Sequence, residues 1–153
     1  MIERYALPEI KQIWSEENKY KTWLAVEIAA CEALCELGRI PAEALQTIQE
    51  KANFTVERVA EIEAVTNHDV IAFLTCVGEY VGEDSKYIHL GLTSSDMLDT
   101  ALAVQMKEAG TLIVEQMQGL RNALLEQAKE HRYTIMMAVS YTHLDVYKRQ
   151  GKK

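Results

Sequence analysis

The sequence is poor in residues that interrupt helices and in those that build extracellular scaffolds. Its 153 residues include only 2 prolines and 7 glycines, which favours a mainly helical fold of about one domain. The 3 cysteines are an odd number without a secretory signature, so we expect reduced thiols in the cytoplasm. Because the sequence contains no apolar run of membrane-spanning length, we expect no membrane span.

The sequence also lacks an excess of positive charge. Its formal net charge is -7 at pH 7, which argues against a general binder of nucleic acid or of anionic membranes. An anionic ligand would have to be held by local donors, such as helix N-termini, hydroxyl groups or histidines.

Apolar residues recur at helical spacing through most of the chain and predict an all-α fold. We expect helices over approximately residues 8–14, 16–37, 41–52, 56–66, 68–81 and 94–131. Residues 1–7 and 87–90 are predicted to be extended. Cys31 and Cys35 share one face of the second helix, where core packing is favoured over metal binding because no further ligand is obvious.

A first polar corner, Thr-Asn-His-Asp, occupies residues 66–69. Thr66 or Asn67 can cap the helix that follows, and Asp69 lies in its first turn, where a negative charge is favoured. His68 lies at the mouth of this corner. It is either a structural, hydrogen-bonded residue or a group that transfers protons or binds an anion.

A second polar corner, His-Leu-Gly-Leu-Thr-Ser-Ser-Asp, occupies residues 89–96 and leads into the last helix. Thr93 and Ser94 lie where a helix start exposes backbone N–H groups and a partial positive charge. They are therefore candidates for holding a phosphate or a carboxylate, with an ordinary N-cap as the alternative. Near the start of the chain, Arg4 and Tyr5 offer a cation and a phenol, with plain solvated side chains as the alternative.

The last predicted helix is too long for a small domain to bury. At 1.5 Å per residue it would extend for about 55 Å. Its apolar stripe comprises Leu98, Leu102, Ala109, Ile113, Met117, Leu120 and Leu124. We therefore expect this helix to belong to a larger helical assembly.

The character of the sequence changes after Met137. The peptide Val139–Gln150 can be back-translated into a near-perfect inverted repeat, and it looks like a translated sequencing adapter. We predict that residues 139–153 are a non-native tail, with a genuine basic tail as the alternative. The predicted domains are 1–93, a helical N-terminal domain, and 94–138, the start of a helical bundle.

Three motifs, in order and at suitable spacing, resemble one protein family. They are Met-Ile-Glu-Arg-Tyr at the start, Thr-Asn-His-Asp-Val at 66–70 and His-Leu-Gly-Leu-Thr-Ser-Ser-Asp at 89–96. Over residues 1–137 the chain resembles the N-terminal part of the bacterial adenylosuccinate lyases, in the fumarase/aspartase superfamily. The resemblance implies the N-terminal helical domain of that fold, followed by the first long helix of its central bundle.

The resemblance also implies a carbon–nitrogen lyase of purine biosynthesis. Such enzymes release fumarate from adenylosuccinate to give AMP, and they also cleave the succinylated aminoimidazole-carboxamide ribotide. A nucleotide substrate, a homotetramer and a cytoplasmic location are implied, with no metal or organic cofactor. Among its site residues, His68 and His89 are implied as catalytic. Substrate contacts are implied for Arg4, Tyr5, Asn67, His68, Asp69, Thr93 and Ser94.

The sequence departs from the family pattern after Met136-Met137. The family continues with Gly-Arg-Thr-His-Gly, whose histidine is assigned as the general acid, whereas Ala138 follows here. The loop that carries the family's base is absent too, so we expect the chain alone to be inactive. The competing hypotheses are a sister lyase, such as one acting on argininosuccinate, and a non-catalytic helical module that binds a partner through the 98–124 stripe.

Overall fold

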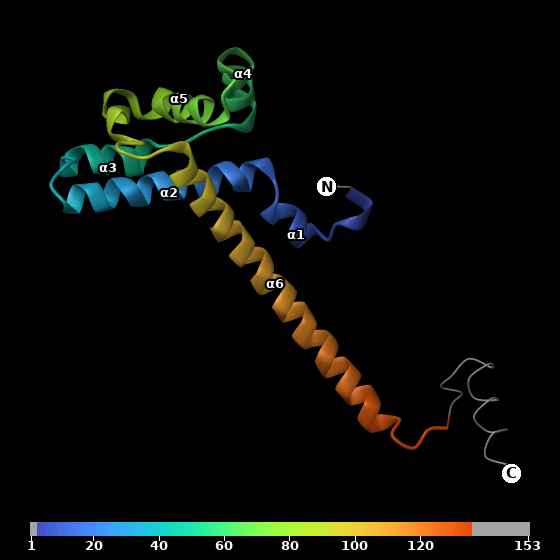
Figure 1. The fold of residues 1–153 in the computed structure, drawn as a ribbon. Helices are drawn as coiled ribbons and strands as arrows, with labels where there is room; N and C mark the ends of the chain where they lie inside the picture. The colour runs from blue at the N-terminus through green and yellow to red at the C-terminus, as the bar shows by residue number, and fades with distance from the viewer. Residues whose placement is uncertain (1–2, 136–153) are drawn as a thin grey trace, which may run out of the picture. The chain divides into compact units, whose positions relative to one another are not determined.

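The computed structural model describes residues 3–135, and this part of the chain is all-α, as predicted (Figure 1). Its elements, in order, are η1 (Glu3–Tyr5), α1 (Pro8–Ile13), α2 (Glu16–Glu36), α3 (Ala42–Lys51), α4 (Val56–Thr66), α5 (Asp69–Val81), η2 (Gly82–Tyr87) and α6 (Ser94–Glu130). The prediction of an extended start over residues 1–7 was wrong, because Glu3–Tyr5 form a 3-10 turn before the proline that opens α1.

Local hydrogen bonds set the ends of the helices much as the sequence predicts. The Ser15 hydroxyl oxygen accepts the Asn18 N–H at 3.1 Å and caps α2. Thr55 caps α4 in the same way, accepting the Arg58 N–H at 3.3 Å. At the end of α2, Gly38 has a φ of 69°, a conformation that glycine adopts without steric cost.

The unit formed by Met1–Val114 has its core around an aromatic cluster on α2 and α5. The rings of Tyr20 and Phe73 are stacked with centroids 5.6 Å apart, and Trp23 meets Phe73 edge-on at 5.4 Å. Phe54, in the segment before α4, packs against the rings of both Tyr20 and Phe73. Helices α2 and α3 lie side by side on one side of this core, and α4 and α5 lie on the other (Figure 1). Cys31 and Cys76 are buried here as free thiols, so core packing is confirmed for Cys31.

The buried face of α6 differs from the predicted stripe. Its buried residues are Met97, Ala101, Gln105 and Ala109. Of the predicted stripe, only Ala109 is fully buried, Leu98 is partly buried and Leu102 is exposed. The buried positions recur every four residues, so the face that meets the core is set by Met97, Ala101, Gln105 and Ala109, and Leu102 and Ile113 lie on other faces of the helix.

The second unit comprises Glu115–Lys153, of which the structure describes residues 115–135. Its described part is the remainder of α6 and a short turn segment, with Met117, Leu120 and Leu124 exposed. The domains predicted at 1–93 and 94–138 stay predictions. Within residues 3–135, no helix combines the length and hydropathy needed to cross a membrane.

The α6 assignment predicts unequal effects of two methionine truncations on the same helix. Met97 is 0% exposed and Met106 is 60% exposed. We expect Met97→Ala to lower the free energy of unfolding by about 2–5 kcal/mol, because it leaves a cavity. The matched Met106→Ala change should cost less than about 0.5 kcal/mol. Urea unfolding followed by circular dichroism measures both, and equal effects would contradict the assigned face.

Candidate active site

The first corner joins α4 to α5 through two residues with unusual roles. Asn67 ends α4 in the left-handed conformation, with a φ of 52°, and its N–H donates to the Glu63 carbonyl at 2.8 Å. His68 is the N-cap of α5, because its Nδ1 accepts the Ile71 N–H at 3.4 Å. The prediction that Thr66 or Asn67 caps this helix was therefore wrong. The Thr66 hydroxyl instead bonds to the carbonyls of Ile62 and His68, at 3.1 and 3.3 Å.

His68 can take two different roles according to its protonation. When Nδ1 is unprotonated it caps α5, and Nε2 then carries the ring proton. When both nitrogens are protonated, the Asp69 carboxylate lies 3.5 Å from Nδ1 and can pair with the ring. The side chains of His68 and Asp69 are each almost half exposed, so both are open to a ligand.

The second corner is a tight turn rather than the extended segment predicted at 87–90. Tyr87 ends η2, and His89 and Gly91 have φ values of 64° and 78°. The Leu92 N–H donates back to the His89 carbonyl at 3.3 Å. Because the chain reverses here, His89 turns back toward α2 instead of continuing along η2.

At the start of α6, the donors of Thr93 are engaged by a carboxylate of the same corner. The backbone N–H and the hydroxyl of Thr93 donate to one oxygen of Asp96, at 2.8 and 2.9 Å. These two bonds, the backbone one first, hold the pKa of the Asp96 carboxyl below its usual value. Thr93 and Ser94 thus lie at the helix start as predicted, and the donors of Thr93 are arranged to hold a carboxylate.

His89 is fixed by Glu27, a residue that sequence reasoning missed. One carboxylate oxygen of Glu27 lies 2.6 Å from His89 Nδ1, and the other accepts the His89 backbone N–H at 2.9 Å. Glu27 is 1% exposed, whereas the His89 side chain is 20% exposed. A signal did exist in the sequence: Glu27 lies between Trp23 and Cys31 on the apolar face of α2, where an unpaired carboxylate would be costly.

Arg4 and Tyr5 lie in η1 with exposed side chains. The Arg4 guanidinium lies 4.8 Å from the centroid of the Tyr5 ring, so the cation and the phenol form one small surface. The following helix, α1, is tied to the core because the Ile13 carbonyl accepts bonds from Gln105 and Asn18, at 2.9 and 3.0 Å.

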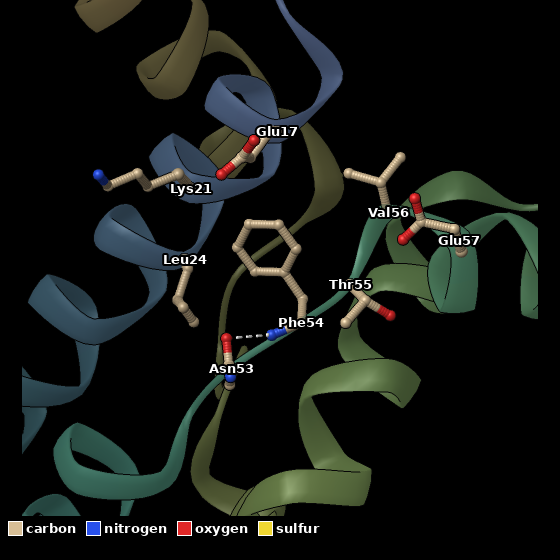
Figure 2. Close-up of a pocket in the computed structure, with 8 residues that line it drawn as sticks. All are labelled: Glu17, Lys21, Leu24, Asn53, Phe54, Thr55, Val56 and Glu57. Carbon is tan, nitrogen blue, oxygen red and sulfur yellow. Dashed lines mark hydrogen bonds between the residues drawn. The ribbon is translucent and has the colours of Figure 1, made fainter.

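His68 opens α5, whereas His89 follows η2, after α5 has ended at Val81. The segment after α5 packs back along that helix, so Ile88 lines the same hollow as Ile71 and Leu74. The hollow shown in Figure 2, of about 500 Å³, lies between α2 and the start of α4 and includes neither corner. Its lining residues are Glu17, Lys21, Leu24, Asn53, Phe54, Thr55, Val56 and Glu57.

Comparison with known proteins identifies the family of the chain that carries these corners. The family model described as "Lyase" matches residues 3–146. The chain belongs to this lyase family. An adenylosuccinate lyase of Synechocystis sp. is 57% identical over 141 residues, which cover 92% of this chain and 33% of that protein. The adenylosuccinate lyase of Bacillus subtilis is 47% identical over 137 residues, covering 90% of this chain and 32% of that protein.

Solved structures confirm the lyase fold. A fumarate lyase from Mesorhizobium sp. BNC1 superposes with a TM-score of 0.78 at 25% identity, covering 86% of this chain and 32% of that one. A β-carboxy-cis,cis-muconate cycloisomerase from Acinetobacter calcoaceticus gives 0.80 at 25% identity, covering 88% and 33%. The chain therefore spans about a third of the length of the relatives it matches.

The family comparison reaches part of the predicted tail. The lyase family match reaches residue 146 and so enters the segment 139–153 that was predicted to be non-native. This segment lies outside the described residues, and nothing observed supports its interpretation as a translated adapter. Residues 136–138, where the sequence departs from the family motif, also lie outside them.

The Asp96 carboxylate predicts a pH dependence of stability. Its folded pKa lies below the usual 3.8, so its contribution is present above that value and is lost as the pH falls through the folded pKa. We expect Asp96→Asn to lower the melting temperature at neutral pH, and this difference from the unmodified chain should shrink in acid. Melting curves between about pH 7 and about pH 3 measure it. Asp99→Asn, an exposed change on the same helix, is the control, and a pH-independent difference would contradict the assignment.

Proposed function

We propose that this chain forms the N-terminal part of an adenylosuccinate lyase and contributes two separate substrate-binding corners to it. The observation that carries this proposal is the 57% identity with the Synechocystis adenylosuccinate lyase over 92% of the chain. The family match includes both corners, since it covers residues 3–146. The 57% identity favours a purine substrate over that of a sister lyase such as argininosuccinate lyase.

The proposed reaction is a β-elimination. A base removes a proton from the carbon beside a carboxylate of the succinyl group, and that electron pair forms the double bond of fumarate. The carbon–nitrogen bond breaks, and the nitrogen leaves with its electron pair and takes up a proton to become the amino group of AMP. Negative charge builds up on the carboxylate beside the reacting carbon, so fixed donors around it lower the barrier.

The described residues supply donors suited to such a substrate. At the second corner, the Asp96 carboxylate occupies the Thr93 donors, so a substrate carboxylate would bind there by displacing it. At the first corner, His68 and Asn67 are exposed beside the start of α5. Arg4 and Tyr5 add an exposed cation and a phenol suited to a nucleotide phosphate.

We place a homotetramer in this proposal, because large apolar side chains of α6 remain exposed. The exposed apolar residues of α6, among them Leu102, Met106 and Ile113, offer a surface for association. The same surface supports the second candidate, a non-catalytic helical module. A cytoplasmic location is supported by the three free cysteines.

A chimera tests the proposed activity. The aligned segment of the Synechocystis enzyme is replaced by residues 1–137 of this chain, and fumarate release from adenylosuccinate is followed by absorbance. We expect turnover on the order of the parent enzyme's rate, because side chains needed for the site are supplied by both corners. A folded chimera with the parent's oligomeric state but without turnover would contradict the proposal and favour the non-catalytic module.

In the active chimera, single changes then test the two corners. His68→Ala and His89→Ala should each lower kcat by about 10²–10⁴-fold if the ring transfers a proton or stabilises charge in the transition state. Gln46→Ala, an exposed change on α3, is the control. If the kinetics of His68→Ala or His89→Ala match those of the control, that histidine has no role in catalysis or substrate binding.

A further inference from the structure

The pairing of Glu27 with His89 places a carboxylate in the described core. A carboxylate that is 1% exposed loses its hydration, and this loss must be offset by hydrogen bonds. Both of its oxygens are used by the same residue: one lies 2.6 Å from the ring Nδ1 and the other accepts the backbone N–H at 2.9 Å. Glu27 therefore clamps His89 at two points, one on the main chain and one on the ring.

The clamp also explains how His89 keeps a backbone conformation that side chains disfavour. His89 has a φ of 64°, and left-handed residues other than glycine are uncommon. Glu27 comes from α2, 62 residues earlier in the chain, so a tertiary contact adds to the local bond between the Leu92 N–H and the His89 carbonyl in holding this conformation. Holding both the backbone and the ring fixes the direction in which the imidazole points.

We propose that Glu27 is a positioning residue that holds His89 in the tautomer with its proton on Nδ1 and presents Nε2 to the substrate. This proposal rests on the proposed lyase function. A carboxylate offers only acceptors, and one of its oxygens is already taken by the backbone N–H, so Nδ1 must be the donor of the short bond. Nε2 is then unprotonated in the neutral ring, ready to accept a proton or a hydrogen bond from the substrate.

The neighbouring groups leave this clamp undisturbed. The Cys31 thiol, one turn along α2, donates to the Tyr87 carbonyl at 3.6 Å. Burial first, and then the charge of Glu27, raises the pKa of Cys31 to about 11, so a second anion does not form beside the carboxylate. On the other side of His89, the Asp96 carboxylate is engaged by Thr93. Glu27 is thus the carboxylate bonded to the ring.

Glutamine at position 27 would reverse the pattern of donors. It has the shape of glutamate but carries one oxygen and one NH₂ group. Its oxygen can still accept the His89 backbone N–H, which cannot change its role. Its NH₂ group would then face Nδ1 and donate to it, which moves the ring proton to Nε2. Glu27→Gln is therefore a nearly isosteric change that inverts the tautomer.

The tautomer is measured on the whole chain, labelled with ¹⁵N in its histidines, at alkaline pH, where the rings are neutral. Loss of a signal in His89→Asn assigns His89. We expect protonated-type Nδ1 and unprotonated-type Nε2 shifts in the unmodified chain, and the reverse in Glu27→Gln. Glu36→Gln, an exposed change on the same helix, should leave the spectrum unchanged. The proposal would be overturned if the His89 ring carried its proton on Nε2 in the unmodified chain. It would also be overturned if Glu27→Gln left the tautomer of His89 unchanged. If Glu27→Gln does not fold, the unmodified spectrum decides alone.

Kinetics in the active chimera test the consequence for substrate. We expect Glu27→Gln to lower kcat by about 100-fold with little change in KM, because Nε2 still faces the substrate but now carries the ring proton and cannot accept another. A folded Glu27→Gln chimera with an inverted tautomer and full kcat would overturn the positioning role and leave the lyase function intact. An inactive unmodified chimera would overturn the lyase function, and with it the substrate role of Nε2, while the ring spectrum would still decide the tautomer.

Discussion

The burial of α5 is the constraint on which the arrangement of the candidate site depends. Val70, Phe73, Cys76 and Val77 are buried along this helix, so it is held on several sides by its neighbours. Its packing positions both corners, because His68 caps the start of α5 and η2, which packs along α5, leads into the turn of His89. The His68 side chain is 45% exposed and that of His89 is 20% exposed, so the first corner is the more open to solvent.

Backbone strain in the described residues is concentrated at these corners. Asn67 and His89 are the non-glycine residues with positive φ between residues 3 and 135. Each such residue costs of order 1 kcal/mol or more and persists only when its surroundings enforce it. For Asn67 the enforcement is local, through the Glu63 carbonyl at the end of α4. For His89 a local bond from the Leu92 N–H is joined by Glu27 on a distant helix, which makes the second corner the more dependent on the folded core.

The helices and most of their caps could be predicted because their determinants are local. Ser15, Thr55 and Gly38 act within one turn of where they stand in the sequence. The cap of α5 was missed because a histidine ring nitrogen took the role usually filled by a hydroxyl or carboxylate. Both corners were located from their residues, but the Glu27–His89 clamp required knowing which helix packs against the turn. The sequence did show an acidic residue within an apolar stripe, but this signal does not identify the residue with which it pairs.

The two kinds of apolar residue on α6 connect the core to the proposed assembly. Met97, Ala101 and Ala109 lie on its buried face. Other large apolar residues, including Leu102, Met106 and Met117, remain exposed. Large apolar side chains stabilise a fold mainly when they are buried. Those on the exposed faces of α6 therefore add little to the core of this chain. Association through these residues would cover them, which gives these side chains a role that the core of one chain does not supply.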